Sequence, residues 1–304
     1  MVLTVLVTWF IVDQVGLGME ELRALGPGAW LPVHPLGAVA ASVLLLLGYF
    51  FSAALWGRIV SDLGGPAIPA REAVSLFMIA NLGRYVPGKV WQIAGLAALA
   101  RARGVPAATA TGAAVLGQGI ALAAATLVGL WALLQGGETM RGWGMAATVI
   151  VVGGVLLAAT PAFFAKVAKL WFRVARQEAP EGLGSVHGLQ WVALYVLNWM
   201  VYAFSFWVLV ASFGYGGNVL AVASAFAAAY VVGYLAIFAP AGIGVREVSL
   251  TVLLTPHLGL GPAGAVAIIA RVWTTVVEVV PAGAFWVRHL GTAGAGNASE
   301  SHGE

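Results

Sequence analysis

The chain has 304 residues, of which 61% are hydrophobic and only 9% are charged, and its mean hydropathy is +0.94. Soluble domains carry about 25% charged residues, so this composition excludes a soluble globular protein and predicts an all-α polytopic membrane protein. The absence of cysteine excludes a disulfide framework, a thiolate metal site and a cysteine nucleophile, and a net charge of +3 is too small to indicate nucleic-acid binding.

Six segments are long and apolar enough to cross a membrane alone, which takes roughly 20 apolar residues. In chain order they are residues 1–18, 36–56, 106–135, 143–162, 187–212 and 262–287. The first segment lacks a basic stretch at its start and carries Asp13, so we expect a retained helix and not a cleaved signal peptide.

Two further apolar regions, residues 70–103 and 219–256, are each interrupted by proline, glycine and charge. The first break reads NLGRYVPGK over residues 81–89, and the second reads APAGIGVRE over residues 239–247. Lipid cannot satisfy the backbone groups that a break frees, so backbone of this kind must line a protein-enclosed cavity or bind something there. We expect each region to be a broken helix hairpin that enters and leaves the membrane on one side, with two tilted crossings as the alternative.

The distribution of basic residues predicts the orientation. If the N-terminus is cytoplasmic and both hairpins are re-entrant, only two cations, Arg23 and Arg141, lie outside. Nine then lie inside: Arg58, Arg71, Arg101, Arg103, Lys166, Lys169, Arg173, Arg176 and Arg288. We therefore expect an integral protein of a bacterial-type plasma (inner) membrane with both termini in the cytoplasm. Residues 163–178 have the pattern of an amphipathic helix on the cytoplasmic leaflet, a solvated connector being the alternative.

The two halves of the chain share a layout of helix, broken hairpin, corner and long closing helix. Pro240 follows Pro87 by 153 residues, and Pro262 follows Pro106 by 156. The orientation above opens the two hairpins on opposite sides, which is typical of an inverted-topology repeat with its binding site at the paired breaks. We expect a first repeat at 1–135, a second at 136–290 and a disordered tail at 291–304.

Four cations, Arg84, Lys89, Arg246 and Arg271, remain at membrane depth, where charge is costly and usually functional. Helices that start after the breaks direct their positive ends inward, so an anion is favoured there, and phosphate suits arginine and lysine. The candidate binding residues are Asn81, Arg84, Tyr85, Lys89, Trp91, Gln92, Arg246, Glu247, Arg271 and Glu278. The candidate hinge residues are Gly83, Pro87, Gly88, Pro240, Gly242 and Gly244.

Simpler interpretations of these residues stay open. Arg84 and Lys89 can reach the interface with Tyr85 and Trp91 as anchors. Arg246 and Glu247 can pair locally, and Arg271 and Glu278 can pair with them between helices. Gln118 and Asp13 can form interhelical hydrogen bonds, with proton coupling as a second role for Asp13. The aromatic stripe at 191, 195, 199 and 202 is expected to pack or face lipid, with a binding role as the alternative.

The two break sequences together resemble the two motifs of the lysylphosphatidylglycerol synthase transmembrane-region family. This resemblance covers roughly residues 1–290, and Ala241 stands where a glycine is commoner in the family. The family comprises flippase-like membrane proteins, among them the flippase domain of the multiple peptide resistance factor, so the resemblance implies lipid translocation. No soluble synthase domain follows residue 290, so we do not expect aminoacyl transfer from tRNA.

We therefore predict a lipid translocase for a phosphate-bearing anionic or zwitterionic lipid, or for a polyprenyl-phosphate-linked lipid. The alternatives are an intramembrane lipid-modifying enzyme and a small-solute transporter. No HExxH, P-loop or serine-triad pattern occurs, so we do not expect an enzyme, a cofactor or a metal site. The expected partner is a membrane lipid and not a nucleic acid, and the oligomeric state is left open, with a dimer among the options.

Overall fold

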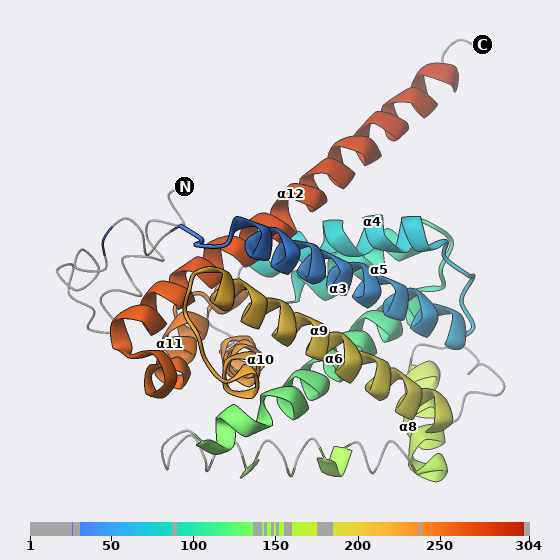
Figure 1. Cartoon of the computed structure of the whole chain (residues 1–304). Coiled ribbons are helices and arrows are strands. Elements are labelled where there is room, and N and C mark those ends of the chain that lie inside the picture. Colours follow the sequence, from blue (N-terminus) through green and yellow to red (C-terminus); the bar gives the residue numbers. More distant parts are fainter. Residues whose placement is uncertain are drawn as a thin grey trace.

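A computed structural model describes residues 31–86, 90–135, 160–174, 185–236 and 239–300, together with Gly26 and a few positions between 142 and 154. Within these ranges the chain is helical (Figure 1). The elements are α3 Pro35–Asp62, α4 Ala70–Asn81, η2 Leu82–Tyr85, α5 Trp91–Arg101, α6 Ala107–Gln135, α8 Pro161–Val174, α9 Ser185–Ser212, α10 Val219–Leu235, η3 Pro240–Gly242, α11 Val245–Leu258 and α12 Leu260–Glu300.

In the described part of the chain, four helices have the length and apolar composition to cross a membrane. They are Pro35–Asp62, Ala107–Gln135, His187–Ser212 and Leu260–Val287. These four confirm the spans expected at 36–56, 106–135, 187–212 and 262–287. The span expected at 1–18 lies outside the described residues, as does most of the span expected at 143–162.

The spanning helices pack through small residues. Helix α3 lies along α9, and α6 contacts both α9 and α10. A Cβ added at Gly129 of α6 would stand 2.6 Å from the backbone nitrogen of Ala228 in α10, so these two backbones are in direct contact. Contacts of this kind replace the hydrophobic effect as the force that holds helices together in lipid.

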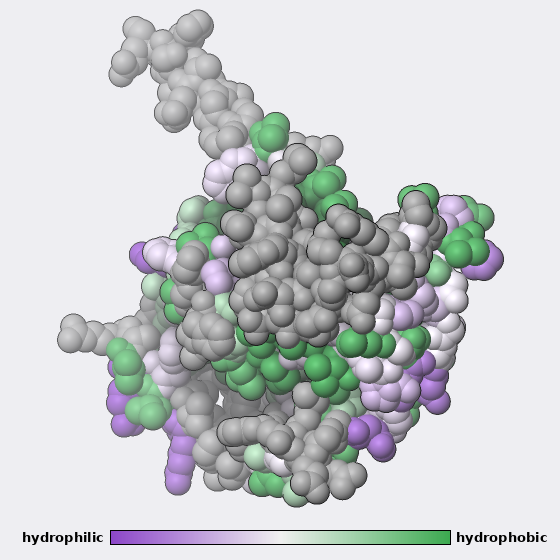
Figure 2. Space-filling model, turned by 90° about the vertical axis from the view of Figure 1, so that its left-hand side faces the viewer, coloured by the Kyte–Doolittle hydropathy of each residue, from purple (hydrophilic) through white to green (hydrophobic). Residues whose placement is uncertain are grey.

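The outer faces of the spans are apolar as well. Large side chains such as Leu36, Leu47, Leu197 and Val280 are exposed. In Figure 2, hydrophobic residues cover much of the described surface that faces the viewer. In water such a surface is unfavourable, whereas in a bilayer it meets lipid tails of matching polarity.

The first hairpin, α4 to α5, starts and finishes at one end of the bundle. Arg103, just after α5, pairs with Glu72 in the first turn of α4. The end of α3 lies there too, because Trp191 Nε1 at the start of α9 donates to Asp62 Oδ2 over 2.8 Å. We call this the basic end, since it carries these exposed cations: Arg58, Arg71, Arg101, Arg103, Lys166, Lys169 and Arg173.

The second hairpin, α10 to α11, starts and finishes at the opposite end. His34, just before α3, donates its backbone N–H to Ser212 O at the end of α9 over 2.9 Å, six residues before α10 is capped by Asn218. The ring of His257 in the last turn of α11 lies 6.0 Å from that of Trp131 near the end of α6. The tips of the two hairpins meet between the two ends, because η2 contacts η3.

Two helix boundaries differ from the expected ones. Helix α12 continues to Glu300, whereas we expected a disordered tail from residue 291, and it does so although Gly291, Gly294 and Gly296 lower the helix propensity of this segment. The amphipathic helix expected at 163–178 is α8, Pro161–Val174, and residues 175–184 lie outside the described part. Phe172 of α8 is buried, Trp171 donates to Ala108 O, and Lys166, Lys169 and Arg173 are exposed.

Candidate functional site

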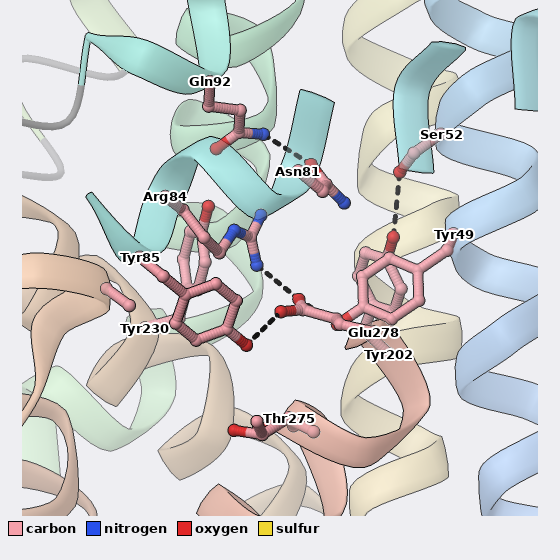
Figure 3. A network of polar contacts seen from close by, with 12 residues as sticks. Tyr49, Ser52, Asn81, Arg84, Tyr85, Gln92, Tyr202, Tyr230, Thr275 and Glu278 are labelled. Atoms are coloured by element: carbon pink, nitrogen blue, oxygen red, sulfur yellow. Dashed lines mark hydrogen bonds and ion pairs between the residues drawn. The ribbon is translucent and has the colours of Figure 1, made fainter. Parts of the chain in front are cut away.

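The carboxylate of Glu278 joins three elements at the centre of the bundle (Figure 3). Its Oε1 accepts a hydrogen bond from the Tyr49 hydroxyl of α3 over 2.5 Å and pairs with the Arg84 guanidinium of η2. Its Oε2 accepts from the Tyr85 hydroxyl over 2.7 Å. Glu278 is only 4% exposed, so its charge is compensated almost entirely by these three side chains.

Local sequence explains how η2 brings Arg84 and Tyr85 to that position. Helix α4 tightens into η2 at Leu82, and Gly83 lies against the start of α5. A Cβ at Gly83 would stand 2.7 Å from the backbone nitrogen of Gln92, a distance that no side chain tolerates. The Gln92 amide then donates to Asn81 Oδ1 over 2.6 Å and joins the two arms of the hairpin.

The second break is held by a separate ion pair. Glu247 lies in the first turn of α11, where its Oε2 accepts the backbone N–H of Gly244 over 2.7 Å as a helix cap. Its Oε1 lies 3.5 Å from Arg271 Nε of α12. Arg271 Nη1 also donates to the backbone oxygen of Ala241 over 3.2 Å, so one arginine fixes both sides of the break.

The backbone of this break is strained. Ala241 has φ 50° and ψ 19°, in the left-handed region that costs a non-glycine residue about 1 kcal/mol or more. Gly242 follows at φ 69°, and a Cβ there would stand 2.8 Å from the carbonyl oxygen of Gly233. Strain of this kind persists where surrounding contacts determine the conformation, as the bond from Arg271 does here.

Arg246 differs from the other two arginines. Its guanidinium carbon lies 4.8 Å from the ring centre of Phe226 and 5.8 Å from that of Tyr230, both on α10. Within the described part of the chain it forms no hydrogen bond and no ion pair. Its charge therefore rests on aromatic faces alone.

Two cavities meet at these guanidinium groups. The first is partly open to the outside, and its polar and aromatic wall comes from Tyr49, Ser52, Trp56, Asn81, Gln118, Tyr195, Trp199 and Tyr202. The second is lined by Tyr85, Tyr234, Ala241, Gly242, Arg271, Thr274 and Glu278. Arg84, Gln92, Tyr230 and Arg246 line both cavities, which makes the two neighbours in space.

Most of the candidate residues gather around these cavities. Asn81, Arg84, Gln92 and Arg246 line the first, and Tyr85, Arg271 and Glu278 line the second, with Glu247 buried beneath Arg271. Among the candidate hinge residues, Gly242 lines the second cavity, Pro240 begins η3, and Gly83 and Gly244 shape the turns described above. Pro87, Gly88 and Lys89 lie outside the described residues, and so does Asp13.

Trp91 differs from the rest of the set. It is the first residue of α5, it is 53% exposed, and it is not part of either cavity wall. Gly83 packs against the backbone of Trp91, because a Cβ at Gly83 would stand 2.7 Å from the carbonyl carbon of this residue.

The packing of the described residues decides several of the open alternatives, whereas the one for Lys89 lies outside the described residues. Arg84 does not extend to the interface, because its side chain is 20% exposed and pairs with Glu278. Arg246 and Glu247 do not pair with each other, since Glu247 is turned toward Gly244 and Arg271. Gln118 does form an interhelical hydrogen bond, to the Tyr230 hydroxyl over 3.5 Å.

The aromatic stripe of α9 faces the interior of the bundle and not lipid. Trp191, Tyr195, Trp199 and Tyr202 are all buried, and the last three line the first cavity. A hydrogen-bond chain lies beside it, in which Asn198 Nδ2 donates to Ser52 Oγ over 2.6 Å and Ser52 contacts the Tyr202 hydroxyl at 2.9 Å.

Sequence reasoning did not single out Tyr49, Ser52, Asn198 or Tyr230. Ser52 and Asn198 are polar residues inside otherwise apolar spans, and that signal alone could have marked them as interhelical hydrogen-bond groups. Tyr49 and Tyr230 gave no such signal, because a tyrosine in a span is more often a packing residue.

The sequence model of the lysylphosphatidylglycerol synthase TM region matches residues 1–282. The chain belongs to this family. The match confirms the resemblance carried by the two break sequences, and it makes the chain a membrane protein related to the membrane domains of lipid synthases and flippases. A search of curated proteins found none that matches this chain.

Proposed function

We propose that this family member moves a phosphate-bearing lipid between the two leaflets and binds its headgroup between the hairpin tips, at Arg246 and Arg84. Membership of the lysylphosphatidylglycerol synthase TM-region family supports a role in lipid handling. The two cavities, which meet at these guanidinium groups, support a headgroup site at the centre of the bundle. In this proposal the lipid crosses without chemical change, so the protein is a translocase and not an enzyme.

The observation that carries this proposal is the charge balance at the tips. Arg84 and Arg271 are matched by Glu278 and Glu247, so among the described residues of the tips three guanidinium groups face two carboxylates. The excess positive charge belongs to Arg246, which has no acidic partner within the described residues. Burying an unpaired charge is unfavourable. A phosphodiester carries one negative charge and accepts hydrogen bonds from arginine in a bidentate geometry, so it would balance Arg246.

The exchange of ion pairs gives the lipid a means to move the hairpins. Arg84 and Arg246 line the same cavities, so a phosphate bound at Arg246 lies near Arg84 as well. It therefore competes with the Glu278 carboxylate for the guanidinium of Arg84. Loss of the Arg84–Glu278 pair would weaken the contacts through which Glu278 joins α12 to η2 and α3. A ligand shifts the balance between two conformations only if it binds one of them more tightly. We infer that headgroup binding favours the arrangement of the hairpins in which Arg84 is released from Glu278 and can bind the phosphate.

The packing pattern supports an inverted-topology repeat with residues 1–135 and 136–290 as its halves. In the first half, α3 contacts α4 and α5 contacts α6. In the second half, the corresponding helices make the same contacts, α9 with α10 and α11 with α12. Contacts of α4 with α12 match those of α10 with α6. Because the two hairpins open at opposite ends and their tips meet, we infer that the halves are related by inversion and that both hairpins are re-entrant.

Helix length favours re-entrance over two tilted crossings for the first hairpin. Helix α4 has 12 residues and α5 has 11, so each is about 18 Å long or less at 1.5 Å per residue. A hydrocarbon core of about 30 Å is too thick for either helix to cross.

For the orientation, we propose that the basic end faces the cytoplasm of a bacterial-type cell. The seven exposed cations at that end support this through the positive-inside rule. The lysines and Arg173 of α8 would then face the anionic headgroups of the cytoplasmic leaflet, with Phe172 toward the protein.

The proposed function is tested by lipid transfer in liposomes. We expect Arg246→Gln to lower the transfer rate of a fluorescent phosphodiester lipid by about tenfold or more, because hydrogen bonds to charged groups contribute about 1.5–3 kcal/mol. Arg101→Gln removes an exposed cation of the basic end and serves as the matched control. Unchanged transfer in a folded Arg246→Gln protein, or no transfer by the native protein, would refute the proposal.

A further inference from the structure

The first cavity has a wall chemistry that the phosphate site does not explain. Its polar groups are hydroxyls, amides and an indole N–H, which come from Tyr49, Ser52, Trp56, Asn81, Gln118, Tyr195, Tyr202 and Tyr230. Among the described residues that line it, no carboxylate and no lysine occurs, and its charges are those of Arg84 and Arg246. The polar part of the wall is therefore neutral, with positive charge where it meets the second cavity, and the rest of the wall is apolar, with Leu45, Phe77, Ile93, Leu96 and Phe226 among its residues.

Two buried hydrogen-bond donors in this wall are unused. Trp56 Nε1 and Asn81 Nδ2 have no hydrogen-bond partner among the described residues, although Trp56 is 1% and Asn81 2% exposed. Buried donors are nearly always paired in native structures, so two in one cavity call for an explanation. In Figure 3 the free nitrogen of Asn81 points away from Gln92, toward the side where Ser52 and Tyr202 lie.

We infer that the first cavity is a subsite for an uncharged, hydroxyl-bearing headgroup, of the polyol or glycosyl class, attached to the phosphate at Arg246. This inference rests on the proposed function, which supplies the phosphate. Hydroxyl groups of the ligand accept from Trp56 and Asn81, and they also donate to the oxygens of the tyrosines and Gln118. The apolar faces of Trp199 and Tyr195 contact the C–H surface of such a headgroup.

Other headgroups fit this wall less well. An ammonium headgroup would meet the positive charges of Arg84 and Arg246 with no carboxylate in the cavity wall to pair with. A bare phosphate ester would occupy the arginines and leave the donors of Trp56 and Asn81 buried and unpaired. The cavity has positive charge at one side and neutral hydrogen-bond donors and acceptors beyond it. This arrangement favours a lipid whose phosphodiester is attached to a headgroup with hydroxyl groups.

The test compares lipids of equal charge and equal tails. The full chain is purified in detergent, and its relative affinities for dioleoyl-phosphatidylinositol and dioleoyl-phosphatidylmethanol are measured by native mass spectrometry in mixed micelles. Both lipids carry a monoanionic phosphodiester, and only the first carries headgroup hydroxyls. We expect the inositol lipid to bind about tenfold more tightly or better, the effect of two or more added hydrogen bonds. Equal affinities, or tighter binding of dioleoyl-phosphatidylcholine, would overturn the inference.

Two variants locate the preference in the first cavity. Trp56→Phe removes the indole N–H and keeps an aromatic ring, and we expect it to reduce the inositol-to-methanol affinity ratio by about threefold to tenfold. Tyr195→Phe removes only a hydroxyl from the same wall and should reduce the ratio as well, so the test does not depend on one variant folding. Trp207→Phe is the control, because Trp207 stacks on Phe204 outside both cavity walls. An unchanged ratio in both cavity variants would contradict the assignment.

Transfer of the same two lipids in liposomes separates this inference from the proposed function. If the inositol lipid binds preferentially but neither lipid is transferred, the subsite holds and translocation is wrong. If both lipids are transferred and their affinities are equal, translocation holds and the hydroxyl subsite is wrong.

Discussion

At the scale of single residues, the site depends on how each buried charge is compensated. Glu278 receives an arginine and two tyrosine hydroxyls, and Glu247 receives an arginine and a backbone N–H. Each carboxylate therefore fixes a cation that would otherwise be as free as Arg246. The pair of Arg58 with Asp62 compensates less charge, because Arg58 is 53% exposed and water already solvates its guanidinium.

This difference predicts the effect of breaking the Arg84–Glu278 pair. We expect Arg84→Ala to lower the free energy of unfolding by about 3 kcal/mol, because it leaves a buried carboxylate with two neutral donors. Adding Glu278→Gln should recover part of that loss by removing the charge. Chemical unfolding of purified protein in detergent measures both effects.

The matched control for that prediction is Arg58→Ala, for which we expect a loss of less than about 1 kcal/mol. Equal losses for Arg84→Ala and Arg58→Ala would mean that the Glu278 carboxylate is solvated and not held by the pair.

At the scale of elements, the two breaks reach similar positions by different means. The first depends on the missing Cβ of Gly83, which allows η2 to lie against the start of α5. The second depends on the left-handed backbone of Ala241 and Gly242 and on the cap that Glu247 gives to α11. In both, the break places an arginine of its own hairpin, Arg84 or Arg246, at the meeting point of the cavities.

The first break gives a matched pair of glycine substitutions. Gly83→Ala should destabilise the protein by about 1–3 kcal/mol, because its Cβ would meet the backbone of Trp91 and Gln92 at 2.7 Å. Gly95→Ala lies in α5 with nothing within 4 Å of the added Cβ, and should be neutral or stabilising by up to about 1 kcal/mol.

Thermal unfolding of the two variants in detergent measures this difference. Similar melting temperatures for Gly83→Ala and Gly95→Ala would show that η2 does not lie against α5 as described.

At the scale of the whole molecule, the proposed translocation depends on two hairpins that start and finish at opposite ends of the bundle and touch at their tips. The proposed headgroup site between them would then be reached from either end, if one hairpin at a time moves away. The basic end and the opposite end differ strongly in charge within the described residues, so the bilayer distinguishes them.

The opposed hairpins predict labelling from opposite sides of the membrane. The native chain has no cysteine, so a thiol reagent can label only the cysteine that a variant introduces. We expect Gly216→Cys, exposed before α10, to react with a membrane-impermeant thiol reagent in intact cells. Arg101→Cys, exposed at the end of α5, should react only after the membrane is permeabilised. Labelling of both positions from the same side would contradict the inverted arrangement.

The sequence by itself determined the membrane class, four described spans and the position of both breaks. These features depend on local properties, namely the apolar content of about 20 consecutive residues and the effect of proline and glycine on a single helix. The family could also be recognised from the two break sequences, since each is a continuous stretch of the chain. For the same reason, Arg84, Arg246, Arg271 and Glu278 stood out as charges within apolar sequence.

Only the tertiary structure decided which charges pair and which one is left over. Glu278 meets Arg84 from 194 residues away and Tyr49 from 229, and no local pattern encodes such contacts. Glu247 adjoins Arg246 in sequence, yet it turns to cap α11 and to hold Arg271. Neighbours in a helix point to different faces, so pairing is set by which helix packs opposite each face. That packing leaves the charge of Arg246 to Phe226 and Tyr230, beside a cavity whose neutral wall is assembled from six separate helices.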